Sequence, residues 1–225
     1  MSTEVIFVAI MFLALAVPMI AARFGYAFVN AATIFLVMTT TIITGHIISL
    51  FGYASSVGTV LFAAIFLSTD IISELYGHKK AYQTVVMAFI ANILLVSIGF
   101  LVTQIAPFAA NPVSDAIVVL FTFIPRLVFG GLIAFGVSQT IDVYLFALYK
   151  KYTHGRHLWL RNIGSTVISQ AVDTALVVTI AFYGVLPNLL QLFFTVYIIK
   201  VIVALLDTPF CYLARHLSRK HPVNF

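Results

Sequence analysis

The side chains of this protein that could do chemistry are charged and amide groups embedded in long apolar stretches. Placing such a group at the centre of a membrane-spanning helix costs about 2.5–3.5 kcal/mol, so each one requires a structural or functional reason. The candidates are Asp70, Glu74, Arg126, Gln139, Asp142, Asn162, Gln170, Asp173, Lys200 and Asp207, with His46 and Asn92 as lesser members.

Asp173 is the leading candidate for a binding residue. It lies twelve residues after Arg161, hence deep in its apolar stretch, and Gln170 precedes it by three residues, which places both side chains on one helix face. A carboxylate at this depth can accept two parallel N–H bonds from a ligand. It could instead clamp a neighbouring helix by hydrogen bonding. We favour binding, because a buried carboxylate without a function would have to be paired or protonated.

Lys200 occupies the middle of the last apolar stretch. It either forms a buried ion pair with Asp173 or Asp207, or it contacts a ligand directly, and the sequence leaves both interpretations open. Asp207 is followed by Thr208-Pro209. A proline there either frees backbone carbonyls to line a cavity or simply kinks the helix.

Asp70 and Glu74 are four residues apart and therefore share one helix face. Glu74 is near the end of its helix, where an ion pair with the lysines that begin at Lys79 is the simplest expectation. Asp70 is deeper and suits a binding role as well as a structural one. Arg126 begins a helix on the opposite side, where it either reads an anion or pairs with Asp115.

Signatures of ordinary catalysis are missing from the sequence. It contains no Walker A, G-x-S-x-G or H-E-x-x-H motif, and Cys211 is its single cysteine. His154-x-x-His157 has no carboxylate or thiolate nearby in the sequence, so we predict no metal site, no cofactor and no catalytic residues.

The composition indicates a polytopic membrane protein. Of 225 residues, 62% are apolar and 8% are charged, and the mean hydropathy is +1.12. A soluble globule needs about 25% charged residues to cover its surface, and a disordered chain would not contain 21 Phe and 10 Tyr. The net charge of +5 does not indicate a nucleic-acid partner, because the basic residues are not gathered on one soluble face.

Apolar stretches of about 20 residues predict an all-α fold with about seven transmembrane helices in a single membrane domain over residues 1–225. The stretch 116–148 is too long for one span, and Pro125 is the natural break, so residues 113–124 become an interfacial or re-entrant lead-in. The predicted spanning helices are 4–22, 28–50, 57–76, 81–106, 126–148, 162–184 and 189–214.

The basic residues of the loops predict the orientation. With seven helices, ten of the twelve Lys and Arg residues fall on one side, and the opposite loops contain none. By the positive-inside rule, the N-terminus is outside and the C-terminus cytoplasmic in the cell (inner) membrane. The ten are Arg23, Lys79, Lys80, Lys150, Lys151, Arg156, Arg161, Arg215, Arg219 and Lys220.

A short pattern occurs twice. Residues 138–142 and 169–173 both read Ser-Gln-x-x-Asp, on helices that run in opposite directions in the predicted topology. Inverted repeats frame the central site of many transporters, whereas coincidence over five positions is the plainer explanation. Gly130, Ala134 and Ser138 add a run of small residues that favours close helix packing, within the chain or in a homodimer.

Several motifs in order resemble those of the queuosine precursor transporter family, also called the vitamin uptake transporter family. Residues 68–77, Ser-Thr-Asp-Ile-Ile-Ser-Glu-Leu-Tyr-Gly, are similar to its [AST]-D-[IL]-x-x-E-x-[YF]-G signature. The resemblance covers about residues 30–215. The further matches are Arg126, residues 136–142, 158–162, 165–166, 169–174, 181–184, Tyr197, Lys200 and 208–209.

The resemblance implies an importer of 7-deazaguanines such as 7-cyano-7-deazaguanine or 7-aminomethyl-7-deazaguanine, for queuosine modification of tRNA. It also implies a fold similar to the substrate-binding subunits of energy-coupling factor transporters, which usually have six helices, so the first helix here is an addition. Such a base presents adjacent N–H and NH₂ donors that one carboxylate can accept, and an oxygen that Gln170, Gln139 or Asn162 could bind. Its flat face suits aromatic residues such as Trp159.

Two other classes stay open as alternatives. The first is an intramembrane enzyme that uses the buried carboxylates as acid and base groups, and the second is a membrane receptor subunit that does not transport. The energy source is open too. The sequence has no nucleotide-binding loop, so ATP would have to act through partner chains, while proton coupling through Asp173 or Asp70 and facilitated entry both remain possible.

Overall fold

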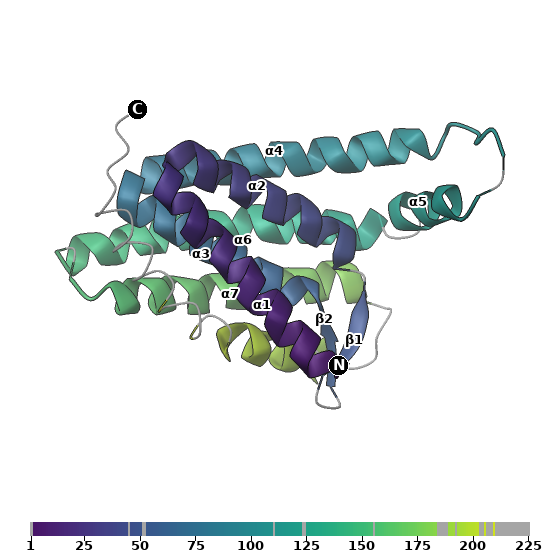
Figure 1. Cartoon of the computed structure of the whole chain (residues 1–225). Coiled ribbons are helices and arrows are strands. Elements are labelled where there is room, and N and C mark those ends of the chain that lie inside the picture. Colours follow the sequence, from purple (N-terminus) through teal and green to yellow (C-terminus); the bar gives the residue numbers. More distant parts are fainter. Residues whose placement is uncertain are drawn as a thin grey trace.

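The computed structural model describes residues 2–44, 46–50, 53–109, 111–122, 125–154, 156–183, 189–191 and 193–202, together with 205 and 209. The chain is a bundle of long helices with one short hairpin (Figure 1). The elements are α1 (Thr3–Ala21), η1 (Ala22–Phe24), α2 (Tyr26–Ile43), β1 (Ile47–Leu50), β2 (Tyr53–Ser56), α3 (Gly58–Tyr76), α4 (His78–Val102), α5 (Pro112–Thr122), α6 (Pro125–Tyr152) and α7 (Leu158–Phe182).

Six helices of the described part are long and apolar enough to cross a membrane. They are α1 extended by η1, α2, α3, α4, the Phe129–Tyr152 part of α6, and the Leu158–Ile180 part of α7. The predicted seventh span, 189–214, begins as an apolar helix at Leu189–Ile202. Most of its remainder, including Asp207, lies outside the described residues.

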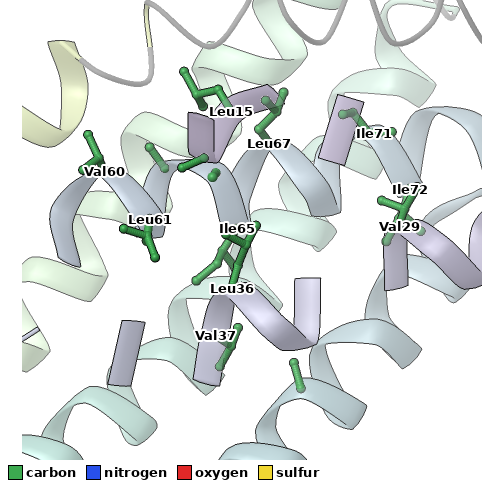
Figure 2. Packing of buried hydrophobic residues seen from close by; sticks show 14 of the residues in the cluster. Leu15, Val29, Leu36, Val37, Val60, Leu61, Ile65, Leu67, Ile71 and Ile72 are labelled. Carbon is green, nitrogen blue, oxygen red and sulfur yellow. The ribbon is translucent and has the colours of Figure 1, made fainter. Parts of the chain in front are cut away.

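Helix α3 is the core of the bundle, because every residue from 58 to 73 is buried except the partly buried Phe62. Its apolar side chains pack against α1 and α2, as Figure 2 shows for Ile65 and Leu67 of α3, Leu15 of α1 and Leu36 of α2. A helix that is buried on every side has no lipid-facing side, so its polar residues must find partners inside the protein.

The loops divide the bundle into two ends, which we call the basic end and the hairpin end (Figure 1). At the basic end, the Tyr26 hydroxyl donates to the Lys80 carbonyl oxygen over 3.4 Å, and Lys150 Nζ donates to the Glu74 carbonyl oxygen over 3.0 Å. These contacts bring the α1–α2, α3–α4 and α6–α7 connections together. The start of α1, the β1–β2 hairpin and α5 lie at the other end (Figure 1).

The predicted helix 28–50 is wrong over its last residues. Helix α2 ends at Ile43, and β1 then pairs with β2 in antiparallel register, with Ile47 opposite Ser56 and Leu50 opposite Tyr53. The threonines and isoleucines of residues 39–48 are β-branched and lose side-chain freedom in a helix, which favours extended structure once packing permits it. Apolarity alone therefore overestimated this span.

Two glycines shape the ends of α3. Gly77 separates α3 from α4 with φ of +89°, which residues with a side chain rarely adopt, so the chain reverses there without a longer loop. Gly58 begins α3 against Thr44, because an added Cβ would lie 2.2 Å from the Thr44 hydroxyl oxygen. A side chain at residue 58 would push the hairpin end of α2 away from α3.

The lead-in predicted for 113–124 is the short helix α5, and the remaining predicted helices lie within a few residues of α1, α3, α4, α6 and α7. The outer helices expose large apolar side chains, as lipid contact requires. On α4 the exposed residues are Val86, Met87, Ile90, Ile93, Leu94, Ile98, Phe100, Leu101 and Val102.

Candidate functional site

A continuous row of polar side chains is buried where α3, α6 and α7 meet, and we call it the polar seam. On α7 its members recur every three or four residues, which puts them all on one helix face. That face would be expensive to expose to lipid, so the other two helices cover it. The seam consists of Thr69, Asp70, Ser73, Glu74, Ser138, Gln139, Asp142, Arg161, Asn162, Ser165, Thr166, Ser169, Gln170, Asp173 and Thr174, with Lys200 from the last helix.

Asp173 is a charged group of the seam that is fully buried. Its Oδ1 accepts a hydrogen bond from Ser138 Oγ over 3.2 Å, and its Oδ2 pairs with Lys200 Nζ. The Lys200 ammonium also lies 5.1 Å from the centroid of the Phe62 ring. Of the two interpretations left open for Lys200, the structure shows the ion pair with Asp173.

Asp142 lies one step nearer the basic end and is also fully buried. Its Oδ1 accepts from Ser169 Oγ over 2.8 Å, and its Oδ2 has no hydrogen-bond partner among the described residues. The side chains of Asp70, Ser165 and Thr166 lie close by. The two Ser-Gln-x-x-Asp copies are therefore reciprocal, because the serine of each copy donates to the aspartate of the other.

An ion-pair cluster closes the seam at the basic end. Arg161 Nη1 lies 2.9 Å from Glu74 Oε2, and Lys150 Nζ lies 3.5 Å from the same oxygen. Arg161 is fully buried, with its guanidinium 5.6 Å from the centroid of the Phe146 ring. The prediction that Glu74 pairs with the lysines that follow α3 is therefore wrong. The sequence had placed Arg161 in a loop, whereas it is the fourth residue of α7 and points into the protein.

Two buried amides leave acceptors unused in the seam. Gln139 Nε2 donates to Thr69 Oγ1 over 2.5 Å. Among the described residues, no donor reaches Gln139 Oε1 or Gln170 Oε1, although both side chains are almost completely buried. A buried acceptor without a donor costs about 1–3 kcal/mol, so a site rich in such oxygens is suited to a ligand that brings N–H groups.

The other predicted residues fall in different places. Asn162 is in the seam, whereas His46 is exposed just before β1. Asn92 Oδ1 accepts from Thr41 Oγ1 over 2.8 Å and so clamps α4 to α2. The side chain of Arg126 and all of Asp207 lie outside the described part of the chain. The small residues 130, 134 and 138 are buried within the chain, which accounts for that run by intramolecular packing.

Comparison with known proteins shows which family the chain belongs to. The family described as "Putative vitamin uptake transporter" matches residues 56–214, which run from the end of β2 through the last helix and contain the whole seam. The chain belongs to the vitamin uptake transporter family.

Three curated relatives in this family carry more specific names. The chain is 35% identical over 173 residues, covering 76% of each chain, to a protein of Bacillus subtilis named "Probable queuosine precursor transporter". It is 27% identical to a protein of the same name from Haemophilus influenzae, over 71% of this chain and 68% of that one. It is 24% identical to the "Queuosine precursor transporter" of Escherichia coli, over 60% of this chain and 59% of that one.

The family match does not extend to α1, α2 or β1, which precede residue 56. No solved structure matches the chain. The similarity to energy-coupling factor subunits therefore stays a prediction, while the membership of a transporter family rests on the seam-bearing helices.

Proposed function

We propose that this protein imports queuosine precursors, which are 7-deazaguanine bases such as the uncharged 7-cyano-7-deazaguanine or the aminomethyl derivative, whose primary amine is positively charged near neutral pH. Three observations support the proposal: the family membership, the names of the three relatives, and a buried seam with more acceptors than donors. The third carries most weight, because it concerns the chemistry of this chain itself.

The proposed binding surface comprises Asp173, Gln170 and Gln139, flanked by Lys200. A guanine-type ring presents N1–H and NH₂ donors side by side, and the free oxygens of the two amides and the Asp173 carboxylate are acceptors. Lys200 holds Asp173 Oδ2 in the present structure. We propose that the substrate takes over this acceptor and that Lys200 Nζ then turns to the ring oxygen, so both charges stay hydrogen-bonded.

Asp70 and Glu74, which the sequence also suggested as binding residues, are outside this proposed set. Asp70 lies against Asp142, and Glu74 is held by Arg161 and Lys150 at the basic end. Asn162 lies three turns from Asp173 along α7, about 16 Å at 1.5 Å per residue, which is more than the length of one base. A single ligand cannot bridge that distance.

We further propose that the basic end faces the cytoplasm and that the last helix completes a seventh span. The loop lysines and arginines gathered there support this orientation through the positive-inside rule. A cysteine introduced at Ser55, with the natural Cys211 replaced by Ser, should be labelled from outside by an impermeant thiol reagent. A reporter fused after Phe225 should read cytoplasmic. Labelling of residue 55 from the cytoplasm would contradict the model of seven spans.

The import function is tested with purified protein. Equilibrium binding of 7-cyano-7-deazaguanine, and counterflow of the labelled base into proteoliposomes preloaded with unlabelled base, should both be observed. Binding without counterflow would favour a receptor subunit, and a new product after incubation would favour an enzyme. Failure of any 7-deazaguanine to bind would contradict the proposal.

A further inference from the structure

Two buried carboxyl groups of the seam take no part in the proposed substrate site. Asp70 on α3 is 1% exposed and Asp142 on α6 is 0% exposed, and their side chains lie close together. Asp142 Oδ2 is buried without a hydrogen-bond partner among the described residues. A hydrogen bond between two carboxyl groups requires a proton on one of them, because an ionised carboxylate only accepts. Two negative charges in contact in a low-dielectric interior would also repel each other strongly.

The charged groups on the surrounding elements are engaged with one another. Glu74 of α3 pairs with Arg161 of α7 and Lys150 of α6. Asp173 of α7 pairs with Lys200 of the last helix. The Ser169 hydroxyl donates to Asp142 Oδ1, and the hydroxyls of Ser165 and Thr166 and the carboxyl group of Asp70 lie close by. Asp142 Oδ2 has no hydrogen-bond partner among the described residues, so a proton is the charge-balancing partner that this oxygen can accommodate.

Hydroxyl groups continue from this pair towards both ends of the seam. On α7, Ser169 adjoins Gln170 of the proposed substrate site, and Ser165 lies one turn from Arg161 at the basic end. On α3, Ser73 is one turn beyond Asp70, and its buried Oγ has no hydrogen-bond partner among the described residues. A hydroxyl both donates and accepts, so it can pass on a proton that a carboxyl group releases.

We infer that Asp70 and Asp142 form the proton-binding site of a symporter, in which one proton enters with each substrate molecule. The inference rests on the proposed import function. The proton joins a carboxylate oxygen of the pair from the outer side, and it leaves to cytoplasmic water through the basic end after the substrate is released. Only this O–H bond forms and breaks, and each cycle moves one positive charge when the substrate is the uncharged 7-cyano-7-deazaguanine.

The test uses the full-length protein in proteoliposomes with the membrane potential clamped at zero. One proton per substrate limits accumulation to about tenfold for each pH unit of acid-outside gradient. Wild type should reach that ratio. Adding 7-cyano-7-deazaguanine outside should lower the pH inside the vesicles, as reported by a trapped pH-sensitive dye. Asp142→Asn should keep binding and equal-pH counterflow but accumulate no substrate above the external concentration. Asp115→Asn, a matched change at an exposed site in α5, should behave as wild type.

The outcomes separate this inference from the proposed function. Wild-type counterflow without substrate-dependent proton entry would overturn the symport inference and leave the import function intact. Absence of wild-type binding and counterflow would remove the import function itself. Gradient-driven accumulation by both Asp142→Asn and Asp70→Asn would show that the proton binds elsewhere. If Asp142→Asn fails to fold, wild-type proton entry still decides the coupling, and Asp70→Asn then tests the location.

Discussion

Asp173 and Asp142 occupy equivalent positions in two copies of one short pattern, yet their surroundings differ. Each accepts a hydrogen bond from the serine of the other copy, over 3.2 Å for Asp173 and 2.8 Å for Asp142. The second partner of Asp173 is the ammonium group of Lys200. Asp142 lies instead beside another carboxyl group, that of Asp70.

This difference teaches that the role of each aspartate depends on the charged group that another helix places beside it, and not on the repeated pattern. For Asp173 that group is Lys200 of the last helix, and for Asp142 it is Asp70 of α3. Asp173 with Lys200 is neutral as an ion pair, so it can exchange its cation for a ligand of matching hydrogen-bond pattern. Under the symport inference, the carboxyl pair of Asp142 and Asp70 is neutralised by a proton, and we expect the occupancy of that proton site to follow the proton concentration. The predictions below either break one of these two arrangements or sharpen the contrast between them.

The largest effect is expected from Lys200→Met. Removing the cation leaves the Asp173 charge buried and uncompensated, which costs about 3–5 kcal/mol of stability. The measurement is the free energy of unfolding in detergent, or the thermal midpoint where unfolding is irreversible. The double variant Lys200→Met/Asp173→Asn should recover part of the loss, because it removes both charges together. Strict additivity of the two single changes would contradict the ion pair.

The same double variant separates stability from binding. It should be more stable than Lys200→Met, yet bind 7-cyano-7-deazaguanine about ten- to a hundredfold more weakly than wild type. A neutral amide cannot accept both N–H bonds, and an unsatisfied buried group costs about 1–3 kcal/mol. Asp142→Asn is the comparison at the equivalent position, and its equilibrium affinity should stay near that of wild type. Near-normal affinity of the double variant would refute Asp173 as a binding residue.

Replacing the two reciprocal serines, Ser138 and Ser169, with alanine should reduce the stability of the protein by unequal amounts. Ser138 donates to a carboxylate that is ionised beside Lys200, and hydrogen bonds to charged groups contribute about 1.5–3 kcal/mol. Ser169 donates to Asp142, which we infer to share a proton with Asp70, so Ser169→Ala should cost only about 1 kcal/mol. Comparing the thermal midpoints of the two alanine variants tests this order. A larger loss for Ser169→Ala would indicate that Asp142 is fully ionised.

Gln170→Ala should give the smallest effect. Its Oε1 has no donor among the described residues, so truncation breaks no internal hydrogen bond to this oxygen. Loss of one neutral hydrogen bond to the ligand should weaken binding by about two- to tenfold, as measured by equilibrium titration. Gln104→Ala, an exposed amide at the hairpin end of α4, is the matched control and should change neither affinity nor stability. Unchanged affinity of Gln170→Ala would exclude this amide from the site.

Much of the architecture could be predicted from the sequence, because lipid imposes a simple length and polarity rule on each helix. The same rule singled out Asp70, Asp142 and Asp173, since a charge inside an apolar stretch is conspicuous. The rule failed at residues 44–50, where apolar β-branched residues form β1 and not the end of a helix. Apolarity does not distinguish these two structures over so short a segment.

The partners of the buried charges could not be predicted in the same way. The sequence suggested two candidate partners for Lys200, and it suggested Lys79 and Lys80 for Glu74, because neighbours in sequence are the only ones visible before folding. The actual partners, Arg161 and Lys150, lie more than 70 residues away along the chain. Likewise, the repeated Ser-Gln-x-x-Asp pattern was visible, but its reciprocal pairing depends on the register between α6 and α7.

That reciprocal pairing has a mechanical consequence. Sliding α7 along α6 by one helical turn, about 5.4 Å, would break the Ser138–Asp173 and Ser169–Asp142 hydrogen bonds at once, so two buried carboxyl groups would need new donors. These two hydrogen bonds oppose sliding of α7 along α6, so we expect the two helices to move together as one rigid body. A transport cycle that alternates between outward-facing and inward-facing states would then displace α3 or the last helix relative to the pair of helices α6 and α7.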